Sequence, residues 1–184
     1  EYYYDIDEAE NFEEVFRDTY ILKHPTPERH SYLIMTFNFA MVNPDVGHIE
    51  ESFEENGKTV IRHFLSRYER FFDKGEREEI LVLGRTEHQL REIFIKISQK
   101  DLKLYLFIDE YDNCANQVLM GIRHERNELY EALVHEEGPL RTLFKVVKAS
   151  SAESVFDRVF ITGVSPVVMS DITSGYNIAK NIYL

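Results

Sequence analysis

Acidic residues follow directly on an apolar run in LYLFIDEYDN, residues 104–113. The apolar part is typical of a buried strand, and it ends on Asp109 and Glu110, with Asp112 close behind. Burying a carboxylate is costly unless another group pairs with it. A metal ion together with a phosphate could be that partner, which makes these acids the first candidates for chemistry.

An apolar strand that ends in Asp-Glu has the form of the Walker B motif of P-loop nucleotide hydrolases. In this interpretation Asp109 holds the shell of a Mg²⁺ ion through water, and Glu110 orients the attacking water. Both acids must stand on a rigid strand end, because a small displacement spoils in-line attack. The alternative is that they cap a solvated loop, while Asp112 caps the next helix and Tyr111 packs against the sheet.

The chain contains one candidate for the phosphate-binding loop that such a site needs, the GKT at residues 57–59 within SFEENGKTV. A P-loop would place a further glycine at position 52, where Ser52 stands. The stretch also lies in a helical pattern and carries Glu54 and Glu55 where backbone amides should cradle phosphate. We therefore expect that it is not a P-loop, and that this chain alone binds ATP weakly or not at all.

Three runs rich in apolar and aromatic residues predict the core strands of one sheet, near residues 31–39, 104–108 and 158–164. Helical patterns separate them, so the strands need crossover connections, which are right-handed and give a parallel α/β layer. In such sheets ligand groups gather at the carboxyl ends of the strands. Such ends carry Asp109, Glu110, Thr162 and Ser165.

Helical periodicity is clearest over residues 49–72, where Gly57 is expected to bend or split the helix. A capping-box pattern at Thr86 predicts a second helix that runs to about Gln99. Asp112 or Asn113 can cap a short helix to Gly121, and Pro139 is expected to begin another. The segment EILVL, residues 79–83, is too short to assign by its period and could be strand or helix.

The bulk composition, with 43% hydrophobic and 29% charged residues in 184, predicts a single domain over residues 1–184. A net charge of -12 disfavours nucleic acid and anionic lipid as partners. The single cysteine, Cys114, excludes an intrachain disulfide and fits a reducing compartment, so we expect the cytoplasm. No apolar run is long enough to cross a bilayer, so no membrane partner is expected.

LYLFIDEYDN, followed by RVFITGVSPVVMSDITSGYNIAKNI from residue 158, resembles the AAA-ATPase-like domain family of the P-loop NTPase superfamily. Many members of this family also carry a nuclease-like domain of the PD-(D/E)xK type. A weaker likeness extends to YYDIDEAENFEEVF and SYLIMTFNFAMV. The resemblance implies a three-layer P-loop fold, here partial, in which helices flank a parallel sheet. It also implies that the Walker A segment lies just before residue 1, so we expect the chain to be part of a longer domain.

The resemblance also implies roles for single residues. Asp109 and Glu110 match the Walker B acids, and Tyr111 and Asp112 complete the DEYD signature. Mg²⁺ and ATP are the implied cofactor and substrate of the complete domain, with Asp109 and Asp112 as the cofactor contacts.

The segment TGVSP, residues 162–166, matches the end of the next strand, where related ATPases place a polar residue that senses the γ-phosphate. Thr162 and Ser165 are both candidates, and the choice between them is open. An ordinary transition from strand to turn is the alternative.

In the sheet order that the resemblance implies, the Walker A strand pairs with the strand that precedes TGVSP. Without that strand, residues 159–164 would form an exposed apolar edge, which invites pairing with another chain. We therefore expect either self-association through this edge or a chain trimmed from a longer protein.

Two functions from different classes follow. The first is part of an ATP hydrolase that relies on Asp109 and Glu110, with Thr162 or Ser165 reading the γ-phosphate. The second is a degenerate P-loop fold that serves as an interaction or regulatory module without hydrolysis. A metal nuclease that uses the two acids ranks last, because the lysine-bearing strand of such sites is missing and the net charge opposes it.

Overall fold

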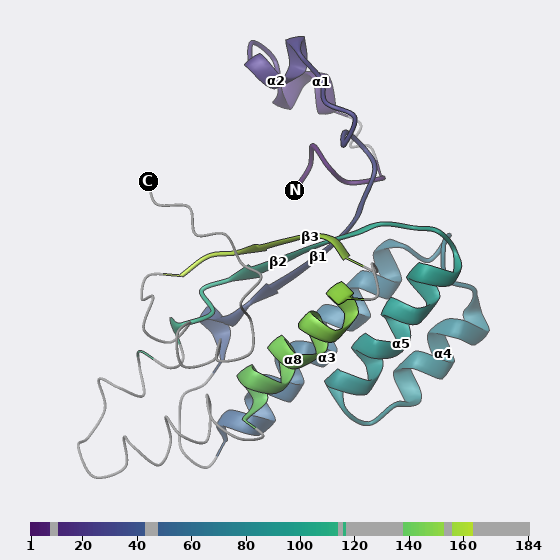
Figure 1. The fold of residues 1–184 in the computed structure, drawn as a ribbon, viewed down its shortest axis with the longest axis vertical. Coiled ribbons are helices and arrows are strands. Elements are labelled where there is room, and N and C mark those ends of the chain that lie inside the picture. The colour runs from purple at the N-terminus through teal and green to yellow at the C-terminus, as the bar shows by residue number, and fades with distance from the viewer. Residues whose placement is uncertain (8–10, 43–47, 114–115, 117–137, 153–155, 164–184) are drawn as a thin grey trace.

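The computed structural model describes residues 1–7, 11–42, 48–113, 116, 138–152 and 156–163 (Figure 1). Three strands form one parallel sheet in the order β1-β2-β3. Their bounds are Leu33–Asn38 for β1, Leu104–Asp109 for β2 and Phe156–Ile161 for β3. The α/β fold with a parallel sheet and flanking helices is therefore confirmed, although the third strand begins and ends earlier than residues 158–164.

The bounds of the helices are Phe12–Val15 (α1), Tyr20–Lys23 (α2), Phe39–Met41 (the 3-10 helix η1), Ile49–Arg67 (α3), Lys74–Val82 (α4), Thr86–Gln99 (α5) and Pro139–Ala152 (α8). Helices α3, α5 and α8 form where the sequence predicts them, and the structure adds α1, α2, η1 and α4. Figure 1 shows α3, α5 and α8 on the same side of the sheet, with α1 and α2 in a small lobe set away from it. Helix α4 packs on α5. No helix in the described ranges is long and apolar enough to cross a bilayer.

One face of the sheet carries the core. Alternate residues of β1 and β2 are buried against the helices: Leu33, Met35, Phe37, Leu104, Leu106 and Ile108. They meet the apolar stripes of α3, α5 and α8, among them Ile61, Leu65, Ile93, Ile97, Phe144 and Val147. Side chains alternate between the faces of a strand, so the residues between these buried ones point to the opposite face.

The opposite face is aromatic and partly open. Tyr105 stacks on Phe107 with ring centroids 4.3 Å apart, and Phe107 meets Phe160 edge-on at 6.1 Å. Phe160 is 43% exposed. In Figure 1 helices α3, α4, α5 and α8 lie on the other side of the sheet, and α1 and α2 stand apart from it.

Helix α3 runs unbroken through Gly57, so the predicted bend or split is wrong. A Cβ atom at Gly57 would lie 2.5 Å from Thr86 Cγ2, so the glycine allows α3 and the start of α5 to approach closely. The helix ends at Arg67, before the end of the apolar stripe, and Phe72 packs into the core from the turn that follows.

Two local assignments differ from the sequence patterns. The undecided segment at residues 79–83 lies largely in α4, which begins with a capping box between Asp73 and Glu76. The capping box expected at Thr86 does not form. Thr86 is the first helical residue, and its backbone N–H and hydroxyl both donate to the Glu54 carboxylate of α3 at 3.0 Å.

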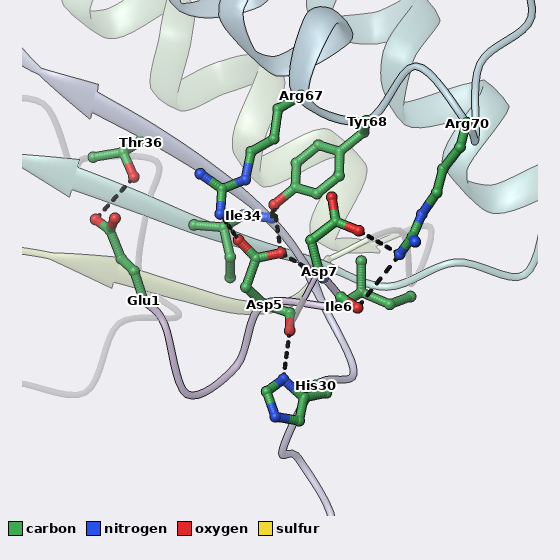
Figure 2. Close-up of polar contacts among 10 residues, drawn as sticks. All are labelled: Glu1, Asp5, Ile6, Asp7, His30, Ile34, Thr36, Arg67, Tyr68 and Arg70. Atoms are coloured by element: carbon green, nitrogen blue, oxygen red, sulfur yellow. Dashed lines mark hydrogen bonds and ion pairs between the residues drawn. The ribbon is translucent and has the colours of Figure 1, made fainter. Parts of the chain in front are cut away.

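A buried carboxylate anchors the N-terminal segment to the sheet (Figure 2). Asp5 is 2% exposed, forms a bridge with Tyr32 just before β1, and forms an ion pair with Arg67 at the end of α3. The Tyr68 hydroxyl donates to Asp5 Oδ1 at 2.9 Å and accepts the backbone N–H of Ile34 at 2.9 Å. Burial raises the pKa of Tyr68 above its ordinary value, so the hydroxyl keeps the proton that this arrangement needs.

Replacing Tyr68 should test this anchor. Tyr68→Phe leaves the Ile34 N–H without its acceptor and Asp5 without one donor, so we expect a loss of about 1–3 kcal/mol in the free energy of unfolding. Urea denaturation measures it. Tyr20→Phe, at a side chain that is 77% exposed, is the control and should change little. Equal stability of the Tyr68 variant and the wild type would contradict the anchor.

Replacing Gly57 should test the contact between α3 and α5. Gly57→Ala should lower the free energy of unfolding by about 1–3 kcal/mol through overpacking against Thr86, although alanine favours a helix. The same substitution should cost less in a Thr86→Ala background, because the two γ atoms of Thr86 are gone. Gly84→Ala, where an added Cβ meets nothing within 4 Å, is the matched control. Thermal and urea unfolding of the four variants provide the comparison.

Candidate functional site

The carboxyl ends of β2 and β3 lie side by side and bring two of the predicted site residues together. Thr162, directly after β3, donates a hydrogen bond from its hydroxyl to Oδ1 of Asp109, the last residue of β2. The backbone reinforces the contact, because the Thr162 N–H donates to the Ile108 carbonyl at 2.8 Å. The Tyr111 N–H in turn donates to the Thr162 carbonyl at 3.3 Å.

Asp109 is half-buried and is held through one of its two carboxylate oxygens. Oδ1 accepts the Thr162 hydroxyl and also the backbone N–H of Glu110 at 3.0 Å. Oδ2 accepts no hydrogen bond from the part of the chain that the structure describes. A carboxylate with one fixed oxygen and one open oxygen is suited to hold the water shell of a hard cation such as Mg²⁺.

Glu110 stands in an abrupt turn immediately after the strand. Its φ is 50°, in the left-handed region that residues other than glycine seldom adopt. The Asn113 N–H closes the turn by donating to the Glu110 carbonyl at 3.0 Å. The side chain is exposed, and its carboxylate forms no hydrogen bond or ion pair with another described residue. Strained backbone of this kind is concentrated at functional sites, although strain alone assigns no role.

Tyr111 and Asp112, the second half of DEYD, point into the protein. Tyr111 is 6% exposed, and burial raises the pKa of its phenol to about 12, helped by the charge of Asp112. Asp112 is 1% exposed, and its carboxylate accepts the Asn116 side-chain amide at 2.9 Å. These contacts give Asp112 a structural role at the start of the next segment, and its role as a cofactor contact stays a prediction.

Other sequence candidates lie elsewhere. Ser165, the alternative to Thr162, falls outside the described residues, as do Cys114 and most of the short helix expected after Asn113. The GKT at residues 57–59 lies inside α3, where its backbone belongs to the helix, as expected for a stretch that is not a P-loop. Within the described ranges, no group of three or more His, Cys, Asp or Glu side chains could hold a metal ion.

Sequence reasoning missed the cluster around Asp5. A cavity of about 300 Å³ opens beside it, between the N-terminal segment, β1 and α3, and its walls include Thr36, His63 and Arg67. Both Asp5 oxygens already accept hydrogen bonds, from Arg67, Tyr68 and the Asp7 N–H, so this carboxylate is structural. It lies at the amino end of β1, whereas Asp109 lies at the carboxyl end of the sheet. In the sequence, only the acidic Asp5 among the aromatic and apolar residues of EYYYDID could have pointed to this cluster.

The sequence was then compared with known proteins. The family model named AAA-ATPase_like, described as "Predicted AAA-ATPase", matches residues 1–173. The matched range includes every described strand and helix, and with them Asp109, Glu110 and Thr162. Curated proteins and solved structures gave no match. Because the family model matches nearly the whole chain, this protein belongs to the AAA-ATPase-like family.

Proposed function

We propose that this chain is part of a domain that binds and hydrolyses ATP, with Asp109 and Glu110 as its Walker B acids. The observation that carries the proposal is the hydrogen bond from Thr162 to Asp109 at the carboxyl edge of the parallel sheet. Ligands of open α/β sheets bind at this edge. Family membership supports the proposal, since the matching model describes an AAA-ATPase.

In this proposal Asp109 holds Mg²⁺ through water. Its Oδ1 is fixed by Thr162 and by the Glu110 N–H, so the open Oδ2 has a defined position toward the cation shell. Mg²⁺ neutralises phosphate charge when it is bound. A single carboxylate suffices for this role, because Mg²⁺ keeps most of its waters and takes further oxygens from the phosphates. The arrangement of the described residues therefore fits the ion.

Glu110 then orients the attacking water. Its exposed carboxylate has no partner among the described residues, so it can accept a hydrogen bond from water without losing an internal contact. The turn at φ 50° takes this side chain out of the regular alternation of β2. Asp109 and Glu110 are thus neighbours in sequence with separate tasks.

Thr162 is the better-supported candidate for the residue that contacts the γ-phosphate, and Ser165 remains the alternative. A hydroxyl has one proton to donate. The Thr162 hydroxyl donates it to Asp109 in this structure, and a phosphate oxygen would compete for the same donor. When the γ-phosphate accepts this hydrogen bond instead, Thr162 would stay beside Asp109, whose Oδ1 would keep the hydrogen bond from the Glu110 N–H.

A phosphate cradle must complete the site. We propose that it comes from a glycine-rich segment outside residues 1–184, because the GKT at residues 57–59 belongs to α3. On its own, this chain is then expected to bind ATP weakly. The cytoplasm is the compartment we propose, with neither nucleic acid nor a membrane as a partner of this domain.

Calorimetric titration of Mg-ATP into the full-length protein tests the proposal. Asp109→Ala should weaken Mg-dependent binding by about tenfold or more, because the water shell of the cation loses the carboxylate that holds it. Glu110→Gln should keep binding and lower the rate of hydrolysis by about 10²–10⁴. Glu78→Gln, an exposed acid on α4, is the control. Wild-type hydrolysis in Glu110→Gln, or no binding heat from any form, would remove the ATPase assignment.

The runner-up is an interaction module that associates through β3. The observation that favours it is the place of β3 at one end of the strand order, where its outer edge pairs with no strand in the described ranges. An edge strand of this kind has unpaired backbone groups, which can pair with a strand of another chain. If the chain is such an interaction module, the DEYD residues would only pack against the sheet and cap the next helix, without hydrolysing nucleotide.

Sedimentation of the isolated chain tests this alternative. Self-association through β3 predicts a dimer or larger species that Phe160→Lys shifts toward the monomer, because an edge charge opposes strand pairing. Tyr20→Lys on the remote α1 and α2 lobe should leave the distribution unchanged. A monomeric wild type at all concentrations would rule out this mode of association.

A further inference from the structure

Gly163, the residue directly after Thr162, lies against the residues that follow Glu110. A Cβ atom at Gly163 would be 2.2 Å from Cε1 and 2.6 Å from Cδ1 of Tyr111, and 2.7 Å from Oδ1 of Asp112. Real Cβ atoms do not approach other atoms this closely. The φ of Gly163 is not positive, so the position needs glycine for space and not for its backbone conformation.

The surface that meets Gly163 is rigid. Both Tyr111 and Asp112 are buried, and Asp112 is bonded to Asn116 by its carboxylate and by its carbonyl. The Tyr111 ring belongs to the main hydrophobic cluster, so it cannot move without disturbing the core. A side chain at position 163 would therefore push the end of β3 away from Tyr111 and Asp112 and weaken the backbone hydrogen bonds that join the two strand ends.

Thr162 lies beyond the regular strand pairing and is held by a few hydrogen bonds. Regular pairing of β3 with β2 stops at Ile161. Beyond it, the described ties between the two strand ends are the backbone bonds of Thr162 to Ile108 and to Tyr111 and the hydroxyl bond of Thr162 to Asp109. The second of these ties leads back to Tyr111, the residue whose ring meets Gly163.

We infer that Tyr111 is a positioning residue for the site: its ring, packed on Gly163, sets the separation of the two strand ends and so holds Thr162 against Asp109. The expected effect on catalysis rests on the proposed function, because the spacing of the strand ends affects catalysis only if Asp109 and Thr162 take part in ATP hydrolysis. Tyr111 touches neither nucleotide nor metal in this account and acts through Thr162 and Asp109.

The ring carries this role, not the phenol oxygen. The atoms nearest to Gly163 are the ring carbons Cε1 and Cδ1. Burial raises the pKa of Tyr111 to about 12, so the phenol stays neutral near pH 7 and adds no charge beside the acids. Phenylalanine should therefore replace tyrosine at this position without loss of the positioning.

The test uses Tyr111→Phe, Tyr111→Ala, Gly163→Ala and the double variant Tyr111→Ala/Gly163→Ala in the full-length protein. Tyr111→Phe should match the wild type. Tyr111→Ala and Gly163→Ala should each lower kcat by about 10–100-fold, since a displacement near 1 Å has effects of this size, with a change of less than about threefold in the Kd of Mg-ATP. The double variant should lose less than the two single losses combined, because the truncated ring removes the clash with Tyr111, while the contact of the new Cβ with Asp112 Oδ1 remains.

Hydrogen–deuterium exchange over residues 108–113 and 158–163 gives a second readout that does not depend on catalysis. Exchange at both strand ends should be faster in Tyr111→Ala and Gly163→Ala than in Tyr111→Phe and the wild type. Gly84→Ala, where the new Cβ meets open space, should leave exchange at both strand ends unchanged.

The two readouts separate the inference from the proposed function. A wild type that neither binds nor hydrolyses Mg-ATP, with the expected pattern of exchange, would sink the ATPase assignment and leave the positioning contact standing. An active wild type with unchanged exchange in Tyr111→Ala, or with equal activity of the Phe and Ala variants, would overturn the positioning role. If Gly163→Ala does not fold, the comparison of Tyr111→Phe with Tyr111→Ala decides the question.

Discussion

The parallel register of β2 with its two neighbours is the constraint on which the rest of the structure depends. The pairing runs from Leu33↔Leu104 to Asn38↔Asp109 on one side and ends at Ile108↔Ile161 on the other. Both crossovers move in the same direction across the sheet, so right-handed connections place α3, α5 and α8 on one face (Figure 1). A slip of one residue would turn Asp109 toward those helices, where its charge would be costly to bury.

The stabilising polar cluster and the candidate site lie at opposite ends of the parallel strands. At the amino end, the Asp5 carboxylate, the Tyr68 hydroxyl and the Ile34 N–H form a closed set of hydrogen bonds, in which the buried charge is paired with Arg67 (Figure 2). At the carboxyl end, Asp109 and Glu110 keep carboxylate oxygens without described partners. A fully satisfied polar network stabilises a fold, whereas open acceptors beside a constrained backbone suit ligand binding.

Local patterns predicted most of the regular structure. The three strands were recognisable because dense apolar runs bounded by turn residues are typical of buried parallel strands. Helices α5 and α8 followed from a period near 3.6 and from Pro139. The segment at 79–83 stayed undecided because five apolar and acidic residues have no period of their own. At Gly57 the local rule failed, because the contact with Thr86 explains the glycine better than any bend does.

By itself, the sequence determined the α/β class, the strand order along the chain and the acids that end β2, because side-chain period and residue type act over a few neighbouring positions. It also identified Thr162 as a candidate at a strand end. Only the tertiary structure decided that Thr162 meets Asp109, that Gly163 faces Tyr111, and that Asp5 joins Tyr68. These pairs lie far apart in sequence, and their contact depends on sheet register and on the space between packed side chains, which no local pattern encodes.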